Sequence, residues 1–189
     1  MPYVITQPPF TLKFHEMSKV ELESYFKWFL SVIPERVDQL EMVVKNTPGF
    51  EKWRADLTTD SLFQLGEWFK SQVETRKRTE NERQEIEKSF SYPIEVPGVD
   101  LTNRTFSLAM DIGFYFSQVL LARNPSLQWK QTLDQKKFVD YGQPVLVEFG
   151  SVPLNPIRIS ISLAYGLVNG KQGGERLKEL YDFWVQKIT

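Results

Sequence analysis

The sequence NRTFSLAMDIGFYFSQVLLA, residues 103–122, is a long apolar segment on which the rest of the expected fold depends. Its apolar residues recur at intervals of three and four, which is the spacing of one face of an α-helix. A polar residue at 102 or 103 is expected to cap its start. Asn124-Pro125 is expected to end it, because proline lacks an N–H and disfavours helix before it. Gly113 weakens a helix interior, so we expect another backbone to approach closely there.

Strands are expected on both sides of this helix in the sequence. Residues 127–133 and 145–149 alternate between apolar and polar side chains, which is typical of half-buried strands. Residues 10–14 alternate in the same way and predict a first strand that joins the other two. Residues 134–143 are expected to form a mobile surface loop. The chain is therefore expected to be a single globular domain, residues 1–189, of the α+β class, with several helices packed around a small antiparallel sheet of about three strands.

Local signals mark the ends of further helices. Ser18 and Glu21 have the spacing of a capping box, in which each side chain satisfies a free backbone N–H. Pro34 is expected to start a new helix, because proline is suited to the first helical turn. Asn155-Pro156 combines a cap with a first-turn proline, and a helix is expected to follow it.

One internal segment differs from the rest in composition. Between residues 74 and 91 apolar residues nearly vanish, and charged residues of both signs are mixed. This pattern predicts a charged excursion from the domain, either a solvated helical extension or a poorly ordered segment, rather than a binding patch.

Composition limits the function classes. The chain has 23 Lys and Arg against 24 Asp and Glu, a net charge of −1. Residues 1–100 carry 13 basic and 17 acidic residues (−4), and residues 101–189 carry 10 and 7 (+3), so neither half is a candidate for nucleic-acid binding. The first ten residues do not resemble a signal peptide, and no apolar run approaches the ~20 residues of a membrane span. A cytoplasmic protein with no membrane or nucleic-acid partner is expected.

Few residues are suited to catalysis or metal binding. The chain has no cysteine and a single histidine, His15, so thiolate chemistry is excluded and a zinc site would need an uncommon set of carboxylates. No Gly-x-Ser-x-Gly motif accompanies His15, so a serine triad is not expected either. We predict no catalytic residues, no metal site and no cofactor.

A candidate ligand-binding site lies on the second face of the central helix. Asp111 and Tyr115 are one helical turn apart, so they share a side of that helix. With Trp129 and Arg158 they are expected to line a groove between the helix and the sheet. The alternative is a solvated face or a simple Asp–Tyr hydrogen bond. Asp111 with Glu148 is the best candidate for a carboxylate pair, although Glu148 is more simply solvated.

Several short motifs resemble uncharacterised bacterial domains of the immunity type found in polymorphic toxin systems. They are Leu57-x-x-x-Ser61-Leu62-x-x-Leu65-Gly66-x-Trp68, Asp111-Ile112-Gly113-x-Tyr115, Leu127-x-Trp129 and Pro144-Val145-Leu146, all within about residues 53–184. Those domains often have Gly-x-Tyr-x-Gly-Glu in the helix, where this chain has Ser117 and Gln118 in the last two places. The resemblance implies a binding protein rather than a catalyst, and no catalytic residues follow from it.

Three functional hypotheses remain open. The first is a non-enzymatic protein that binds another protein, as an immunity-like or regulatory factor. The second is a small-molecule-binding domain, or an enzyme with a carboxylate-based site, between the central helix and the sheet. The third is self-association through a last amphipathic helix, around residues 177–188. The sequence does not specify the oligomeric state.

Overall fold

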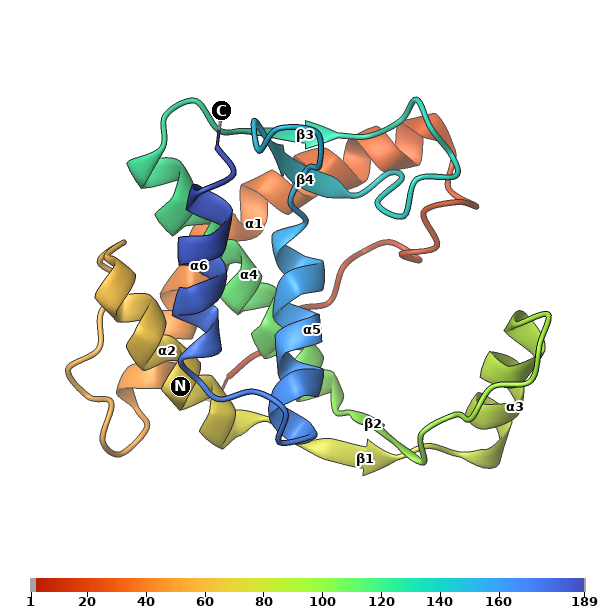
Figure 1. Ribbon diagram of the computed structural model, residues 1–189, viewed down its shortest axis with the longest axis horizontal. Coiled ribbons are helices and arrows are strands. Elements are labelled where there is room, and N and C mark those ends of the chain that lie inside the picture. The colour runs from red at the N-terminus through yellow and green to blue at the C-terminus, as the bar shows by residue number, and fades with distance from the viewer. Residues whose placement is uncertain (1–2, 189) are drawn as a thin grey trace.

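The computed structural model describes residues 3–188, which form six helices and two small antiparallel sheets of two strands each (Figure 1). The α+β class is confirmed, with four strands in place of about three. The elements in chain order are α1 (Lys19–Lys45), α2 (Thr59–Gln72), β1 (Thr75–Lys77), α3 (Glu80–Ser89), β2 (Val99–Leu101), α4 (Asn103–Arg123), β3 (Gln128–Gln131), β4 (Pro144–Val147), α5 (Pro156–Val168) and α6 (Arg176–Val185).

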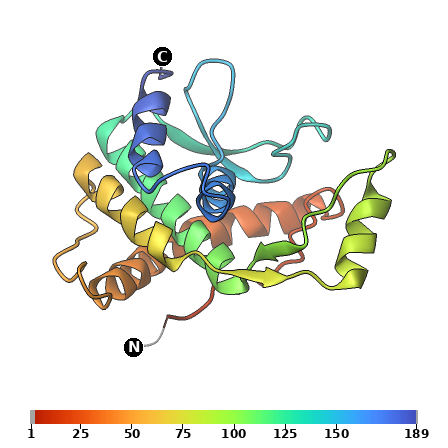
Figure 2. The same cartoon turned by 60° about the horizontal axis from the view of Figure 1, so that its bottom comes forward.

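Helix α4 is the centre of the fold, as expected. It lies between α1 on one side and α5 and α6 on the other (Figures 1 and 2). Thr102 caps its start by accepting a hydrogen bond from the Thr105 N–H, and Asn124 follows its end. By length and composition α4 could cross a membrane, so the prediction that no segment could do so is wrong for this helix. However, 72% of its most apolar 18-residue window is buried inside the fold, so the protein core accounts for its apolar character.

The expected pair of strands after α4 is confirmed. β3 and β4 are antiparallel, with Gln128 opposite Val147 and Gln131 opposite Pro144. The expected strand at residues 10–14 is wrong, since this segment forms turns and irregular structure. Its two aromatic side chains, Phe10 and Phe14, both pack against Tyr25 of α1.

Helix α1 is longer than the sequence predicts. The capping box of Ser18 and Glu21 is confirmed, but Pro34 lies inside the helix and does not begin a new one. Pro34 is exposed, so water can reach the backbone carbonyl that its missing N–H leaves without a partner. Buried residues on both sides of it, including Phe29 and Leu40, keep the helix continuous by packing.

The loop between β3 and β4 is only partly a surface loop. Residues 134–137 are exposed, but Asp140 and Tyr141 are buried, which contradicts the expectation of a mobile loop throughout. Asp140 accepts a hydrogen bond from Asn155 Nδ2 at 2.8 Å, and this contact ties the loop to the start of α5.

Close packing of α4 against α5 depends on Gly113, as the sequence suggested. A Cβ atom at this position would lie 2.8 Å from Ile157 Cδ1 and 2.9 Å from the Pro156 carbonyl oxygen. The second neighbour is backbone and cannot rotate away, so the two helices would have to separate.

We expect Gly113→Ala to lower the free energy of unfolding by about 1–3 kcal/mol, as overpacking of a tight contact does. Urea unfolding followed by circular dichroism measures the change. Gly98→Ala is the matched control, since a Cβ there meets nothing within 4 Å and should leave stability nearly unchanged. Equal stability of the two variants would contradict the close α4–α5 packing.

The charged excursion forms a projecting arm, defined here as residues 74–101. β1 and β2 pair at its root, with Thr75 opposite Leu101, and α3 lies at its far end (Figure 2). The helical alternative for this segment is therefore confirmed for Glu80–Ser89. The helix is separate from α2, because residues 73–79, which include β1, lie between them.

Candidate functional site

Asp111 belongs to a buried ionic cluster that joins α4, α1 and the N-terminal segment. Arg36 donates to Asp111 through Nε, at 2.8 Å, and through Nη2, at 2.6 Å. The Tyr3 hydroxyl donates to the same carboxylate at 2.5 Å. The other N–H groups of Arg36 reach the Val4 carbonyl, Gln39 and Tyr3, so all five donors are used. We call Tyr3, Arg36 and Asp111 the clamp.

The electrostatics of the clamp favour a structural role. Burial raises the pKa of the Asp111 carboxyl, while the hydrogen bonds from Arg36 and Tyr3 favour its charged form and oppose the rise. Burial and the neighbouring carboxylate raise the pKa of Tyr3, so its hydroxyl keeps its proton and remains a donor. Asp111 has no exposed surface, and its carboxylate ties the N-terminal segment and α1 to α4 through Tyr3 and Arg36.

Tyr115 faces a different set of partners from Asp111. Its hydroxyl lies 2.6 Å from Ser61 Oγ and accepts a hydrogen bond from the Leu57 N–H at 3.0 Å. Its ring packs edge-on against Trp53, with centroids 5.5 Å apart. Tyr115 therefore fixes the loop before α2 to the core, and the expected alternative of an Asp–Tyr hydrogen bond does not describe it.

The other two residues of the expected groove also have separate surroundings. Trp129 packs edge-on against Phe29 of α1, with centroids 5.2 Å apart. Arg158 lies 2.9 Å from Asp140 Oδ2, as an ion pair at the start of α5. The structure therefore does not bring Asp111, Tyr115, Trp129 and Arg158 together around one ligand.

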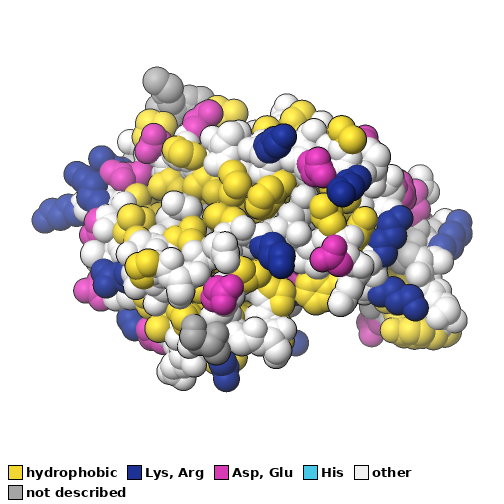
Figure 3. Space-filling view, turned by 90° about the horizontal axis from the view of Figure 1, so that it is seen from above, with side chains coloured by type: hydrophobic (Ala, Val, Ile, Leu, Met, Phe, Trp, Pro, Cys, Tyr) yellow, Lys and Arg dark blue, Asp and Glu magenta, His cyan; other side chains and the backbone are white. Residues whose placement is uncertain are grey.

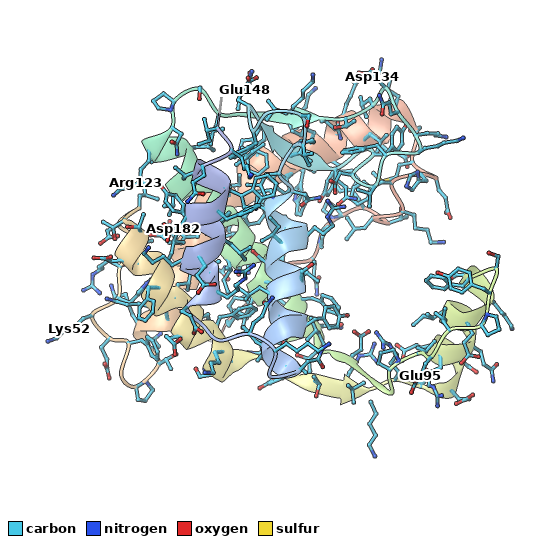
Figure 4. The ribbon with its side chains drawn as sticks, in the orientation of Figure 1. Lys52, Glu95, Arg123, Asp134, Glu148 and Asp182 are labelled. Carbon is cyan, nitrogen blue, oxygen red and sulfur yellow. The ribbon has the colours of Figure 1, made fainter. Side chains whose placement is uncertain are left out.

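The expected carboxylate pair is not assembled either. Glu148 is exposed and lies at the edge of the molecule beyond β4, whereas Asp111 is fully buried (Figure 4). The charged residues labelled in Figure 4 come from different elements and do not converge on one point. Within residues 3–188 no group of three or more metal-ligating side chains is found.

The arm presents the most unusual surface in the molecule. None of the side chains of α3 is buried, and the segment that follows exposes Phe90 and Tyr92, whose rings are 5.9 Å apart. In Figure 3 the arm stands away from the body at the right, with hydrophobic side chains gathered at one edge. On the same view Lys and Arg alternate with Asp and Glu, and no large area of one charge is seen.

Ion pairs order the arm from within. Arg76 donates to Glu82 at 2.7 and 2.9 Å, and Glu82 also accepts from the Thr79 N–H as part of a capping box. At the root, Asp100 accepts a hydrogen bond from the Tyr165 hydroxyl of α5 at 2.6 Å and pairs with Arg78 at 3.1 Å. The mixed charges of this segment therefore maintain its shape.

The sequence predicted an excursion rather than a binding patch, so the aromatic edge of the arm, formed by Phe90 and Tyr92, was not predicted. The sequence feature that could have revealed it is the pair Phe90 and Tyr92, which follows a run with almost no apolar residues. Two large apolar side chains at the end of a solvated segment have no core of their own to join, so they are candidates for an interface.

Acid is expected to open the arm before the body. The hydrogen bonds from Arg76 and from the Thr79 backbone lower the pKa of Glu82 from 4.5 to about 2. Because this pKa is lower in the folded arm, Glu82 stabilises α3 above pH 4.5, and that contribution is lost as the pH falls from 4.5 toward 2. Amide hydrogen exchange of α3 across this range measures the effect.

Glu82→Gln tests the cause, since glutamine keeps the capping hydrogen bond but not the charge. The variant should show a weaker dependence of α3 exchange on pH than the wild type. Glu85→Gln, on the same helix, is the matched control, and the exchange of α3 in this variant should depend on pH as it does in the wild type. Identical acid opening in wild type and Glu82→Gln would refute the assignment.

Comparison with known proteins adds no family to this description, because no family model, curated protein or solved structure matches the chain.

Proposed function

We propose that this chain is a non-enzymatic protein that binds another protein, and that the arm is its contact surface. The observation that carries the proposal is that α3, a helix of ten residues, buries none of its side chains. Each of the other five helices has buried residues in the core.

A helix of this length has little stability of its own. Isolated helices shorter than about 12–15 residues are marginal in water, and most helices in proteins are stabilised by packing. The ion pairs within the arm are partly exposed and weakened by solvent screening, so they orient the arm but do not replace the packing that α3 lacks. A partner that packs against α3 would supply the missing contacts.

The chemistry of the arm suggests what the partner offers. Phe90 and Tyr92 can serve as apolar anchors, and aromatic residues are enriched among the few that dominate binding energy. Charges of both signs surround them, so specificity would come from complementary pairs at the rim. A cytoplasmic immunity-like or regulatory factor, which acts by covering a surface of its target, is consistent with this mode of binding.

Site-specific photocrosslinking in the native cell tests the proposal. A photoreactive phenylalanine analogue replaces Tyr92, and the crosslinked protein is identified by mass spectrometry. We expect one protein to be captured from this position and not from the matched position Phe183, an exposed aromatic residue on α6.

A second variant checks that the arm contributes binding energy. Phe90→Ser should weaken retention of the same protein, while Phe183→Ser should not. Capture of the same proteins from both positions, or retention unaffected by Phe90→Ser, would overturn the arm as the interface.

A further inference from the structure

A cavity of about 650 Å³ lies beside α4, and it shares no lining residue with the smaller cavity at the arm. Its walls come from the N-terminal segment, from the first half of α1, from α4 and from α5. In Figure 1 the N-terminal segment passes to the right of α5 on its way to α1. The volume falls within the range of about 300–1,000 Å³ that is usual for small-molecule sites.

The lining of the cavity is apolar and uncharged. Phe106 and Met110 of α4 line it together with Ile157 and Ile161 of α5, and all four are only partly buried by the protein itself. No Lys, Arg, His, Asp or Glu is among the lining residues in the part of the chain described. A charged ligand would lose its hydration here without meeting an opposite charge, whereas a neutral apolar ligand would not.

The N-terminal wall of the cavity is held in place by the clamp. Tyr3 is bonded to Asp111, and the Thr6 N–H donates to Ser107 Oγ of α4 at 2.8 Å. Ile5 lies between these anchors in the sequence, and Leu12 lies beyond them. Both side chains line the cavity, and their exposed fractions are 39% and 43%. Leu12 also has a φ of +57°, a left-handed conformation that leucine rarely adopts. Two large apolar side chains of the N-terminal segment thus line the cavity and remain partly open to solvent.

The polar groups of the lining differ in what they can offer a ligand. Asn155 uses both N–H groups of its amide on Asp140 and Gln143, so it belongs to the wall. The amides of Gln7 and Asn103 are exposed, and no side-chain hydrogen bond of theirs is found within residues 3–188. These two amides are suited to an uncharged polar group on a ligand whose remaining surface is apolar.

We propose that this cavity binds a neutral amphiphilic small molecule, with an apolar body against Phe106 and Met110 of α4 and Ile157 and Ile161 of α5, and with one uncharged polar group near Gln7 and Asn103. The volume and the uncharged lining favour this class over an anion or a cation. The site is separate from the aromatic edge of the arm, so this proposal does not depend on the proposed protein partner.

Photolabelling of the wild-type protein tests the proposal directly. The probes are a long-chain alcohol with a diazirine in its chain and the carboxylic acid with the same chain. We expect the alcohol to label peptides that contain residues 103–110 or 157–161, and to reach half-saturation at a concentration about tenfold or more below that of the acid. Labelling confined to other segments, labelling that does not saturate, or equal labelling by the acid would overturn the proposal.

Variants that fill the cavity give a second readout. Ile161→Trp on α5 and Met110→Trp on α4 should each raise the half-saturating concentration of the alcohol about tenfold or more. Ile86→Trp is the matched control, because it fills the smaller cavity at the arm and should leave labelling unchanged. Unchanged labelling in a folded Ile161→Trp or Met110→Trp, or equal loss in Ile86→Trp, would refute the site. If a variant fails to fold, the wild-type labelling decides.

Discussion

Arg36→Met is expected to lower the free energy of unfolding by about 3–5 kcal/mol, because it leaves the buried Asp111 carboxyl without its cationic partner. Methionine preserves most of the apolar stem of arginine, so the loss reports the missing charge and hydrogen bonds more than a cavity. Urea unfolding at neutral pH, followed by circular dichroism, measures the difference from wild type.

The double variant Arg36→Met with Asp111→Leu is the control. Replacing both members of a buried pair with apolar residues often costs little, so we expect it to regain much of the stability lost in the single variant. A loss below about 1 kcal/mol in the single variant would contradict the role of the clamp.

The stability deficit of Arg36→Met should also depend on pH. Burial already raises the pKa of Asp111, and removing Arg36 removes the main contact that opposes this rise. A folded pKa above the unfolded value of 3.8 favours the folded variant at low pH and disfavours it as the pH rises through the folded pKa. The deficit should therefore shrink on acidification.

Trp53→Ala is the second substitution expected to have a large effect, about 3–5 kcal/mol of unfolding free energy. Trp53 is 2% exposed, its ring packs against Tyr115, and its indole N–H donates to the Ser61 carbonyl at 3.0 Å. The substitution removes a large buried ring and also this hydrogen bond. Circular dichroism follows the unfolding, since the change removes a fluorophore.

Trp28→Ala is the matched control for Trp53→Ala. Trp28 lies on α1 and is only partly buried, so its loss should cost clearly less. Because both variants lose the same side chain, the difference between them reports burial. Equal losses would contradict the central position of Trp53.

The sequence was sufficient for the elements that depend on local periodicity. A helix at about residues 103–122, a cap at residue 102 or 103 and the antiparallel pair of strands that follows were all predicted, and the structure has the helix at Asn103–Arg123 with Thr102 as its cap. The close approach at Gly113 was also predicted, because glycine inside an apolar helix lowers its stability unless a neighbouring backbone packs against that point.

Elements that depend on tertiary packing were not predicted. Alternation at residues 10–14 indicated a strand, but no neighbouring strand in residues 3–188 pairs with it, and Phe10 and Phe14 pack on α1 instead. Pro34 normally marks a helix start, yet packing on both sides carries α1 through it. In each case a longer-range contact outweighed the local pattern.

For the candidate site, too, the sequence predicted local positions but not tertiary contacts. One-turn spacing correctly put Asp111 and Tyr115 on the same helix, but their partners are remote in sequence, and no local pattern reveals them. Arg36 is 75 residues from Asp111, and Tyr3 is 108 residues from it. Whether a carboxylate on a helix is solvated, catalytic or buried in an ion pair therefore required the three-dimensional structure.

The geometry at the root of the arm has a consequence for how the chain can vary. The chain leaves the body at Thr75 and returns at Leu101, and these residues are paired across β1 and β2. A segment whose ends already lie side by side can be shortened to a tight turn or lengthened, because the entropy of closing such a loop changes only slowly with its length. Insertions, deletions and grafted peptides are thus expected to be tolerated between these two positions, while the same changes inside α4 would disrupt the core.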